Sequence, residues 1–326
     1  MIRRLGEFDR IDRFFKPLAK DFPGAFGLSD DAAVVMPPPG HDLVVTTDAM
    51  VAGVHFLPDD PPGDIARKLL RVNLSDLAAK GATPFAYCLV TSLPRDLDES
   101  WIAAFAAGLA GDQQAFGFHL AGGDSVSTPG PLTLSVTAFG VVPQGRMIRR
   151  LTDRPDDPLF VTGTIGDAAL GLKALQGKLD LPDADKAYLI ERYRVPLPRV
   201  ALAAGLRELA RSALDVSDGL VADCGHLCDV SGLGAIIEAD AVPLSAAARA
   251  ALARKPDLLA LLLTGGDDYE ILFTADAEKR PLILSLAERS GVAITEVGRM
   301  TGPGRSVAVV DGSGTPLDII GGWQHF

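Results

Sequence analysis

The chain has 326 residues, of which 48% are hydrophobic and 22% charged, and its formal net charge is −11. This composition is that of an ordinary folded protein with room for two domains, and it excludes a disordered chain. The negative charge argues against nucleic acids and anionic membranes as partners, and no apolar run approaches the ~20 residues of a membrane span.

The N-terminal half alternates helices and strands. Its start, "MIRRLGEFDRIDRFF", carries charges every few residues, so it predicts an amphipathic helix over residues 7–20 and not a signal peptide. Strands are expected at 33–36 and 43–47. A helix over "DIARKLLRVNLSDLAAKG" begins at Asp64 and stops at Gly81. A strand at 86–93, a helix over 98–115 and strands near 119–121 and 132–142 follow.

A segment rich in proline and charge, "PQGRMIRRLTDRPDDP", interrupts the hydrophobic pattern. We therefore place a domain boundary near residue 148, which gives domains of residues 1–148 and 149–326. The second half restarts with the strand "PLFVTG" and a helix over "GDAALGLKAL". Helices are expected around 184–193 and 198–211, and strands near 213–216, 234–239, 269–274, 294–299 and 307–310. The alternation predicts an α/β or α+β protein.

Acidic patches follow several apolar runs. The patch "AGGDSVS" carries Asp124 directly after two glycines, which predicts a loop, since a lone Gly-Gly-Asp is usually a turn. Other patches combine carboxylates with hydroxyls, and Asn73 and Asp76 share a helix face because they are three residues apart. Oxygen ligands of this kind are what Mg²⁺ prefers, and cations between carboxylates could hold a polyanion such as a phosphate ligand. Taken singly, each patch is also an ordinary turn, helix cap or solvated face.

Other metal and nucleotide motifs are weak. "GLKALQGKLD" has the wrong glycine spacing for a P-loop, and Lys178 is followed by no hydroxyl. In "DCGHLC", helical spacing puts Cys224 and Cys228 on one face and His226 on nearly the opposite side, which disfavours zinc. Together with Cys88 these are the only cysteines, a sparse set that predicts a reducing, cytoplasmic location.

The chain resembles the thiamine-monophosphate kinase family, whose fold is that of aminoimidazole ribonucleotide synthetase. The resemblance lies in "GLSDDAAVV", "TTDAMVAGVHF", "KLLRVNLSDLAAKGATP", "AGGDSVS", "DVSDGLVADCGHL", "GGDDYEI" and "GGWQHF", which follow in order to the last residue. It implies ATP-dependent phosphorylation of thiamine monophosphate to thiamine diphosphate. It also implies a homodimer formed through the N-terminal sheet, and a C-terminal α/β domain that completes the nucleotide and substrate cleft.

The same resemblance implies site residues. Several Mg²⁺ ions would be held by Asp31, Thr46, Thr47, Asp48, Asp76, Asp124, Asp215 and Asp218. ATP would be bound by Gly123, Asp124, Arg149 and Ser217, with Arg146 and Arg150 as alternatives to Arg149. Thiamine monophosphate would be bound by His55, Asp267 and Trp323, although His55 could be an ordinary buried histidine and Trp323 plain core.

The acceptor is a phosphate monoester that is already ionised, so we expect no catalytic base, no phosphoenzyme and direct in-line transfer. Asp267 departs from the family, where the typical motif is Gly-Gly-Glu-Asp-Tyr-Glu, and its carboxylate is one methylene shorter.

Two alternatives remain. One is an ATP-dependent ligase like aminoimidazole ribonucleotide synthetase, and the other is a non-catalytic acidic module that binds metal. Selenophosphate synthetase would need a reactive cysteine near the N-terminus, but the first cysteine is Cys88. A hydrogenase-maturation dehydratase would need a C-terminal cysteine, but the chain ends in "WQHF".

Overall fold

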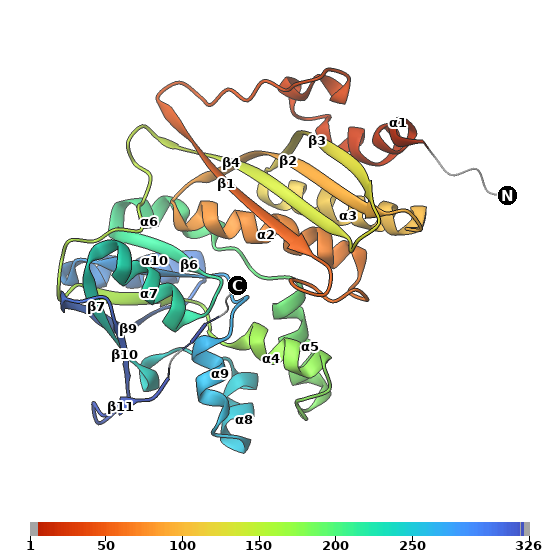
Figure 1. Cartoon of the computed structure of the whole chain (residues 1–326). Helices are drawn as coiled ribbons and strands as arrows, with labels where there is room; N and C mark the ends of the chain where they lie inside the picture. The colour runs from red at the N-terminus through yellow and green to blue at the C-terminus, as the bar shows by residue number, and fades with distance from the viewer. Residues whose placement is uncertain (1–5, 320, 323–326) are drawn as a thin grey trace. The chain divides into compact units, whose positions relative to one another are not determined.

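The computed structural model describes residues 6–319, 321 and 322. The chain divides into two compact units, each with its own sheet (Figure 1). The first unit runs to Leu77 and again from Ala82 to Gly145, and the second comprises Ala78–Gly81 and the chain from Arg146 onward.

The N-terminal segment differs from the regular helix predicted over residues 7–20. It consists of α1 (Glu7–Arg10), a π-helical turn (Ile11–Phe15) and a 3₁₀ turn (Lys16–Ala19). Pro17 lies in the last turn and has no N–H to donate, so an α-helical ladder cannot continue through it. The strand expected at 33–36 is also wrong, because these residues join no sheet; the N–H of Val34 donates instead to the carbonyl of Gly24 at 2.8 Å.

The first unit is built on a four-stranded sheet in the order β1-β4-β2-β3. Its strands are β1 (His41–Val51), β2 (Thr83–Pro94), β3 (His119–Thr128) and β4 (Thr133–Pro143). β2 and β3 are parallel, and such a pair needs a crossover, here α3 (Glu99–Phe116). The helices α3 and α2 (Pro62–Ala79) cover one face of the sheet, and the N-terminal segment packs on the other (Figure 1).

The second unit holds a seven-stranded mixed sheet in the order β11-β10-β7-β9-β5-β8-β6. Its strands are β5 (Pro158–Thr162), β6 (Ala210–Val216), β7 (Leu233–Glu238), β8 (Glu270–Ala275), β9 (Ile294–Pro303), β10 (Val307–Val310) and β11 (Pro316–Leu317). Its helices are α4 (Asp167–Leu175), α5 (Asp183–Arg194), α6 (Ala203–Leu209), α7 (Leu220–Ser231), α8 (Ala246–Arg254), α9 (Leu258–Thr264) and α10 (Arg280–Ser290).

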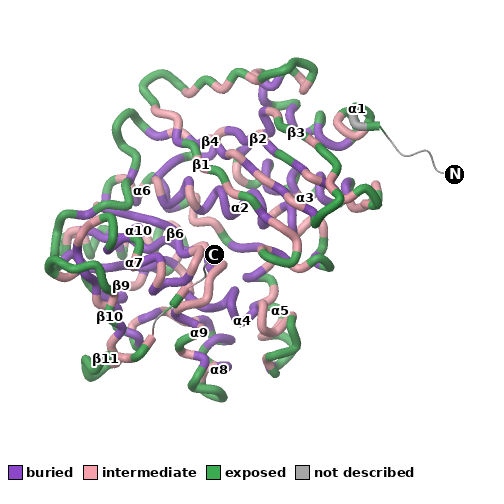
Figure 2. Tube along the Cα trace, in the orientation of Figure 1, coloured by how far each residue is buried: buried purple, intermediate pink, exposed green. Residues whose placement is uncertain are grey.

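Alternation along the strands divides the core of this second unit into two layers. In β6, Leu214 and Val216 pack in the cluster that contains α7, whereas Ala213 packs in the cluster that contains α6 and α10. Successive strand residues point to opposite faces, so both faces of this sheet are apolar and buried (Figure 2). Ala78 and Ala79, the last residues of α2, belong to the second of these clusters.

The strands β5 to β10 follow the predicted ones, but β11, α8, α9 and α10 were not predicted. The helix expected over 198–211 is shorter, because residues 200–202 form a 3₁₀ turn, α6 ends at Leu209 and β6 begins at Ala210. Within the described part of the chain, no helix combines the length and the apolar character that a membrane span requires.

Candidate functional site

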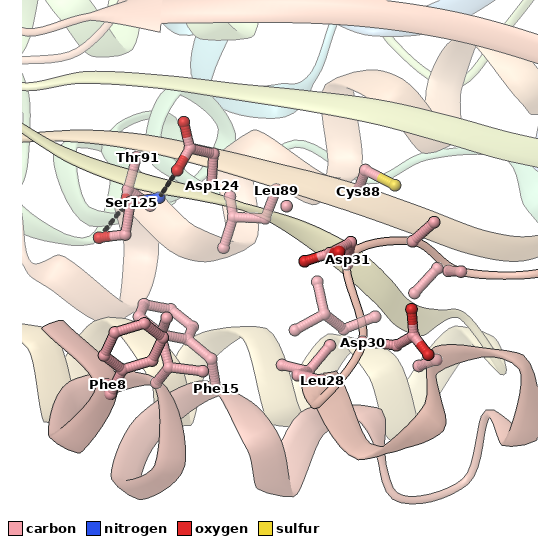
Figure 3. Close-up of a pocket in the computed structure, with 18 residues that line it drawn as sticks. Phe8, Phe15, Leu28, Asp30, Asp31, Cys88, Leu89, Thr91, Asp124 and Ser125 are labelled. Carbon is pink, nitrogen blue, oxygen red and sulfur yellow. Dashed lines mark hydrogen bonds between the residues drawn. The ribbon is translucent and has the colours of Figure 1, made fainter.

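A cavity of about 430 Å³ opens in the first unit between the N-terminal segment and strands β2 and β3. Figure 3 shows its two kinds of wall. Phe8, Phe15 and Leu28 form the apolar wall, and Asp31 and Asp124 contribute carboxylates. The size lies within the usual range of ligand pockets, and the mixture of flat apolar and charged surface suits a ligand that is partly apolar and partly polar.

The Gly-Gly-Asp patch lies inside β3, so the prediction of a loop there is wrong. Gly123 pairs with Leu89 of β2 and has a φ of +155°, and a Cβ there would stand 1.8 Å from the carbonyl oxygen of Leu89. The second glycine is therefore required by the close approach of two strands. Asp124 follows it, exposed, and its Oδ1 accepts the N–H of Ser125 at 2.8 Å.

A second group of oxygen ligands lies where β1 faces α2. The hydroxyl of Thr46 donates to Oδ2 of Asp76 at 2.5 Å. Asp48 lies two residues further along β1 on the same face. Burial, and then the negative charge of Asp76, raise the pKa of Asp48 to about 7. Because the carboxylates of Asp48 and Asp76 repel each other, a cation bound between them would stabilise both in the ionised form.

Thr47 stands apart from this group. Its side chain points to the opposite face of the sheet, where its hydroxyl donates to Oγ1 of Thr137 at 3.1 Å. Of the ligands expected along β1, the structure thus brings together Thr46, Asp48 and Asp76, and it does not bring the hydroxyl of Thr47 to them.

Asn73 adds a buried acceptor on the face of α2 that carries Asp76. Its Nδ2 donates to the carbonyl of Leu69 at 2.9 Å, while its Oδ1 accepts no hydrogen bond within the described part of the chain. A buried amide oxygen without a partner is costly. Carboxylates, a hydroxyl and an unused amide oxygen are hard ligands, so this donor set fits Mg²⁺.

His55 is held at a turn after β1. Its Nδ1 accepts the N–H of Val51 at 3.0 Å, which leaves the proton on Nε2 in the neutral ring. The carbonyl of His55 accepts from Nζ of Lys68, a lysine that is only 2% exposed. The histidine is half-buried and tied down on both its ring and its backbone.

In the second unit, β6 leads into α7 through a turn at Ser217, Asp218 and Gly219. Asp215 is buried in β6, while Ser217 and Asp218 are half-buried. Asp223, which the sequence reasoning missed, accepts the N–H groups of Asp218 and Gly219. Burial, and then the negative charge of Asp218, raise the pKa of Asp223 to about 7.

His226 lies one turn further along α7. One ligand atom each from Asp218, Asp223 and His226 lie within 4.8 Å of one another. Cys224 and Cys228 are buried on the other side of the helix and are free thiols.

The segment 264–270 carries three acids with different surroundings. Asp267 is half-buried with a φ of +74°, and its N–H donates to the carbonyl of Ser217 at 2.9 Å. Asp268 is 1% exposed and accepts the N–H groups of Gly166 and Ala168 at the start of α4. Glu270 is fully buried and pairs with Arg192 and Arg199. Asp268 and Glu270 therefore have structural roles, which the run of acidic residues in "GGDDYE" did not reveal.

The three candidate arginines have different environments. Arg146 forms an exposed ion pair with Glu208 at 2.9 Å. The carbonyl of Arg149 accepts the N–H of Ala213 at 3.1 Å, which fixes the backbone of Arg149 beside β6. Arg149 is exposed to solvent. Arg150 is also exposed, and its positive charge acts on Asp223. Trp323 lies outside the described residues.

Comparisons with known proteins cover nearly the whole chain. Residues 29–142 match the AIR synthase related protein, N-terminal domain, and residues 154–311 match the AIR synthase related protein, C-terminal domain. The thiamine-monophosphate kinase of Caulobacter vibrioides is 45% identical over 98% of this chain and 90% of its own length.

Two solved structures agree with this. The thiamine-monophosphate kinase of Stenotrophomonas maltophilia K279a has a TM-score of 0.84 at 41% identity, covering 96% of this chain and 98% of its own. A structure described as "AaThiL complexed with AMPPCP and TMP" has a TM-score of 0.78 at 31% identity and covers 99% of both chains.

Proposed function

Because the chain belongs to the thiamine-monophosphate kinase family, we propose a division of labour among its residues for the transfer of phosphate from ATP to thiamine monophosphate. The activity itself, ATP-dependent phosphorylation of thiamine monophosphate to thiamine diphosphate, rests on one observation: the near full-length match to these kinases, one of them solved with AMPPCP and TMP. The two-domain α/β fold expected from the sequence is confirmed by the same matches.

The chemistry needs little from side chains beyond position and charge. The accepting oxygen belongs to a phosphate that is already ionised at neutral pH, so no base has to remove a proton. The reaction then depends on in-line alignment and on neutralising the charge of two polyanions. We therefore assign no catalytic base, and direct transfer without a phosphoenzyme remains our proposal.

Mg²⁺ fits the oxygen ligands of both units. In the first unit Thr46, Asp48 and Asp76 would hold one ion, and Asp31 and Asp124 lie at the wall of the cavity. In the second unit the ligands would be Asp215 and Asp218. When bound, such ions neutralise phosphate oxygens and orient them. The task of this chain's residues is to hold the carboxylates close enough to one another that a bound cation relieves their repulsion.

ATP and thiamine monophosphate would meet different residues. The cavity of the first unit, with its apolar wall opposite Asp31 and Asp124, suits the flat base and the charged end of a nucleotide. Ser217 and Arg149 would complete the ATP contacts. His55 would offer its Nε2–H to the thiamine substrate, and the carboxylate of Asp267 would face its cationic ring. Trp323 stays in this proposal on the family resemblance alone.

The direct test is incubation of the purified protein with Mg-ATP and thiamine monophosphate, followed by chromatography for thiamine diphosphate. We expect stoichiometric thiamine diphosphate and ADP. Formation of ADP and phosphate only with a ribonucleotide amidine would indicate the ligase alternative. Cation binding without any turnover of ATP would indicate the non-catalytic module.

We predict that Asp267→Asn raises the KM for thiamine monophosphate about tenfold, or about 1.4 kcal/mol, and leaves the KM for ATP nearly unchanged. Asparagine adopts the left-handed backbone as readily as aspartate, so the turn with its φ of +74° is kept and only the charge is lost. Steady-state kinetics with each substrate varied in turn measures both constants.

Asp267→Glu serves as the matched control, because it restores the typical family residue and the charge. Its two KM values should stay close to those of the parent. An unchanged KM for thiamine monophosphate in Asp267→Asn would make Asp267 a turn residue only.

The protein is expected to be a homodimer formed through the first sheet. Val45, Val90 and Val126 are 53%, 40% and 46% exposed on the sheet face opposite α2 and α3, and association would bury them. Light scattering at micromolar concentration should give twice the chain mass, and Val45→Asp should shift it toward one chain mass. A parent protein that stays monomeric at this concentration contradicts the proposal.

A further inference from the structure

Asp223 lies on α7, but its carboxylate serves the turn that precedes the helix. The residue is 2% exposed. Its Oδ2 accepts the N–H of Asp218 at 2.9 Å and the N–H of Gly219 at 3.1 Å. Its own N–H donates to the carbonyl of Gly219 at 2.9 Å. Asp223 therefore holds the turn through both its side chain and its backbone.

The opposite side of the same turn is closed by backbone. A Cβ on Gly219, whose φ is +116°, would stand 2.5 Å from the carbonyl oxygen of Thr264. A Cβ on Gly266 would stand 2.3 Å from the carbonyl oxygen of Ser217, which also accepts the N–H of Asp267. The backbone of this turn is therefore constrained on one side by close packing and on the other by two hydrogen bonds from its N–H groups to Asp223.

Ser217 and Asp218 are half-buried and carry the accessible side chains of this turn, whereas Asp223 is buried. We propose that Asp223 is a positioning residue, which fixes the backbone of Ser217 and Asp218 so that these two side chains bind Mg-ATP. The inference rests on the proposed function, because it takes the roles of Ser217 and Asp218 from there. Asp223 acts through the turn, since both of its hydrogen bonds go to backbone N–H groups of the turn.

Three variants test this role. Asp223→Ala removes the acceptor, Asp223→Ser shortens it beyond reach of both N–H groups, and Asp223→Asn keeps an oxygen of the same reach without the charge. Asp98→Ala is the matched control, because Asp98 caps α3 through the N–H of Ser100 at 2.9 Å and lies in the first unit. The KM for Mg-ATP, the KM for thiamine monophosphate and kcat are measured below the Tm of each variant.

We expect Asp223→Ala and Asp223→Ser to raise the KM for Mg-ATP about tenfold and the KM for thiamine monophosphate by a clearly smaller factor, because the turn reaches that substrate only through the hydrogen bond from Asp267 to the carbonyl of Ser217. Asp223→Asn should recover most of the loss, and Asp98→Ala should lower Tm without changing either KM. If Asp223→Ala does not fold, the same split in Asp223→Ser decides.

Two results would overturn the inference: a folded Ala or Ser variant with parental KM for Mg-ATP, or an Asn variant as impaired as these, which would make Asp223 a direct metal ligand. A parent protein that forms no thiamine diphosphate would instead refute the proposed function, and that outcome is separate because it is seen before any substitution is made.

Discussion

Phosphoryl transfer is expected to stop when divalent cations are removed. The chain has a formal net charge of −11, and its proposed ligands are carboxylates that face two anionic substrates. Without a cation these charges repel both substrates and one another. We expect excess chelator to lower the rate of thiamine diphosphate formation about a thousandfold or more, equivalent to about 4 kcal/mol in the barrier.

Restoring Mg²⁺ above the chelator concentration should return the full rate, which separates loss of the ion from damage to the protein. Circular dichroism in chelator should show a folded chain. Undiminished turnover in excess chelator would refute a metal-dependent mechanism.

Asp48→Asn and Asp124→Asn are each expected to lower turnover about a hundredfold or more, equivalent to about 2.7 kcal/mol in the barrier. Each substitution keeps the shape of the side chain and removes the charge that would hold a cation against phosphate. Asp42→Asn makes the same change on β1, at a residue whose carboxylate accepts the N–H of Gly145 at 2.7 Å, and it should retain most activity. Near-parental rates in folded Asn variants would show that Asp48 and Asp124 are ordinary strand residues that hold no catalytic cation.

The stability of Asp48→Asn shows whether lost activity reflects lost folding. The pKa of Asp48 is raised in the folded protein from 3.8 to about 7, so folding favours the protonated carboxyl. That contribution is complete below the unfolded pKa and is lost as the pH rises through 7. Asparagine is never ionised, so in the absence of metal the variant should unfold at a higher temperature than the parent at pH 8, and the difference should shrink toward pH 4.

Patterns of residue type predicted the frame of the molecule well. The strands β1 to β10 and the helices α2, α3, α4 and α5 follow from apolar periodicity, because periodicity reports which face is buried, whereas the two-residue strand β11 is too short to show a period. The N-terminal segment did not follow, since a π-helical turn at Ile11–Phe15 passes into a 3₁₀ turn at Lys16–Ala19 that contains Pro17. Residues 33–36 have strand-forming side chains but no neighbouring strand to pair with.

The candidate site was predictable in residue type but only partly in arrangement. The sequence named Thr46, Thr47 and Asp48 together, yet alternation along β1 separates Thr47 from the other two. Gly122 and Gly123 favoured a loop, and only the backbone of Leu89 explains why the strand needs glycine at position 123. Asp223 carried no signal, because its role depends on N–H groups that a sequence does not show.

The end of α2 bears on how the chain could be divided. Ala78 and Ala79 pack in a core cluster with Ile148 and Leu206, and the carbonyl of Lys80 accepts the N–H of Ile148 at 3.1 Å. A fragment that begins at residue 146 would lack this short stretch and expose the apolar surface it covers. The C-terminal half cut at residue 146 is thus not a self-contained module, because four residues of its compact unit lie earlier in the chain, at 78–81.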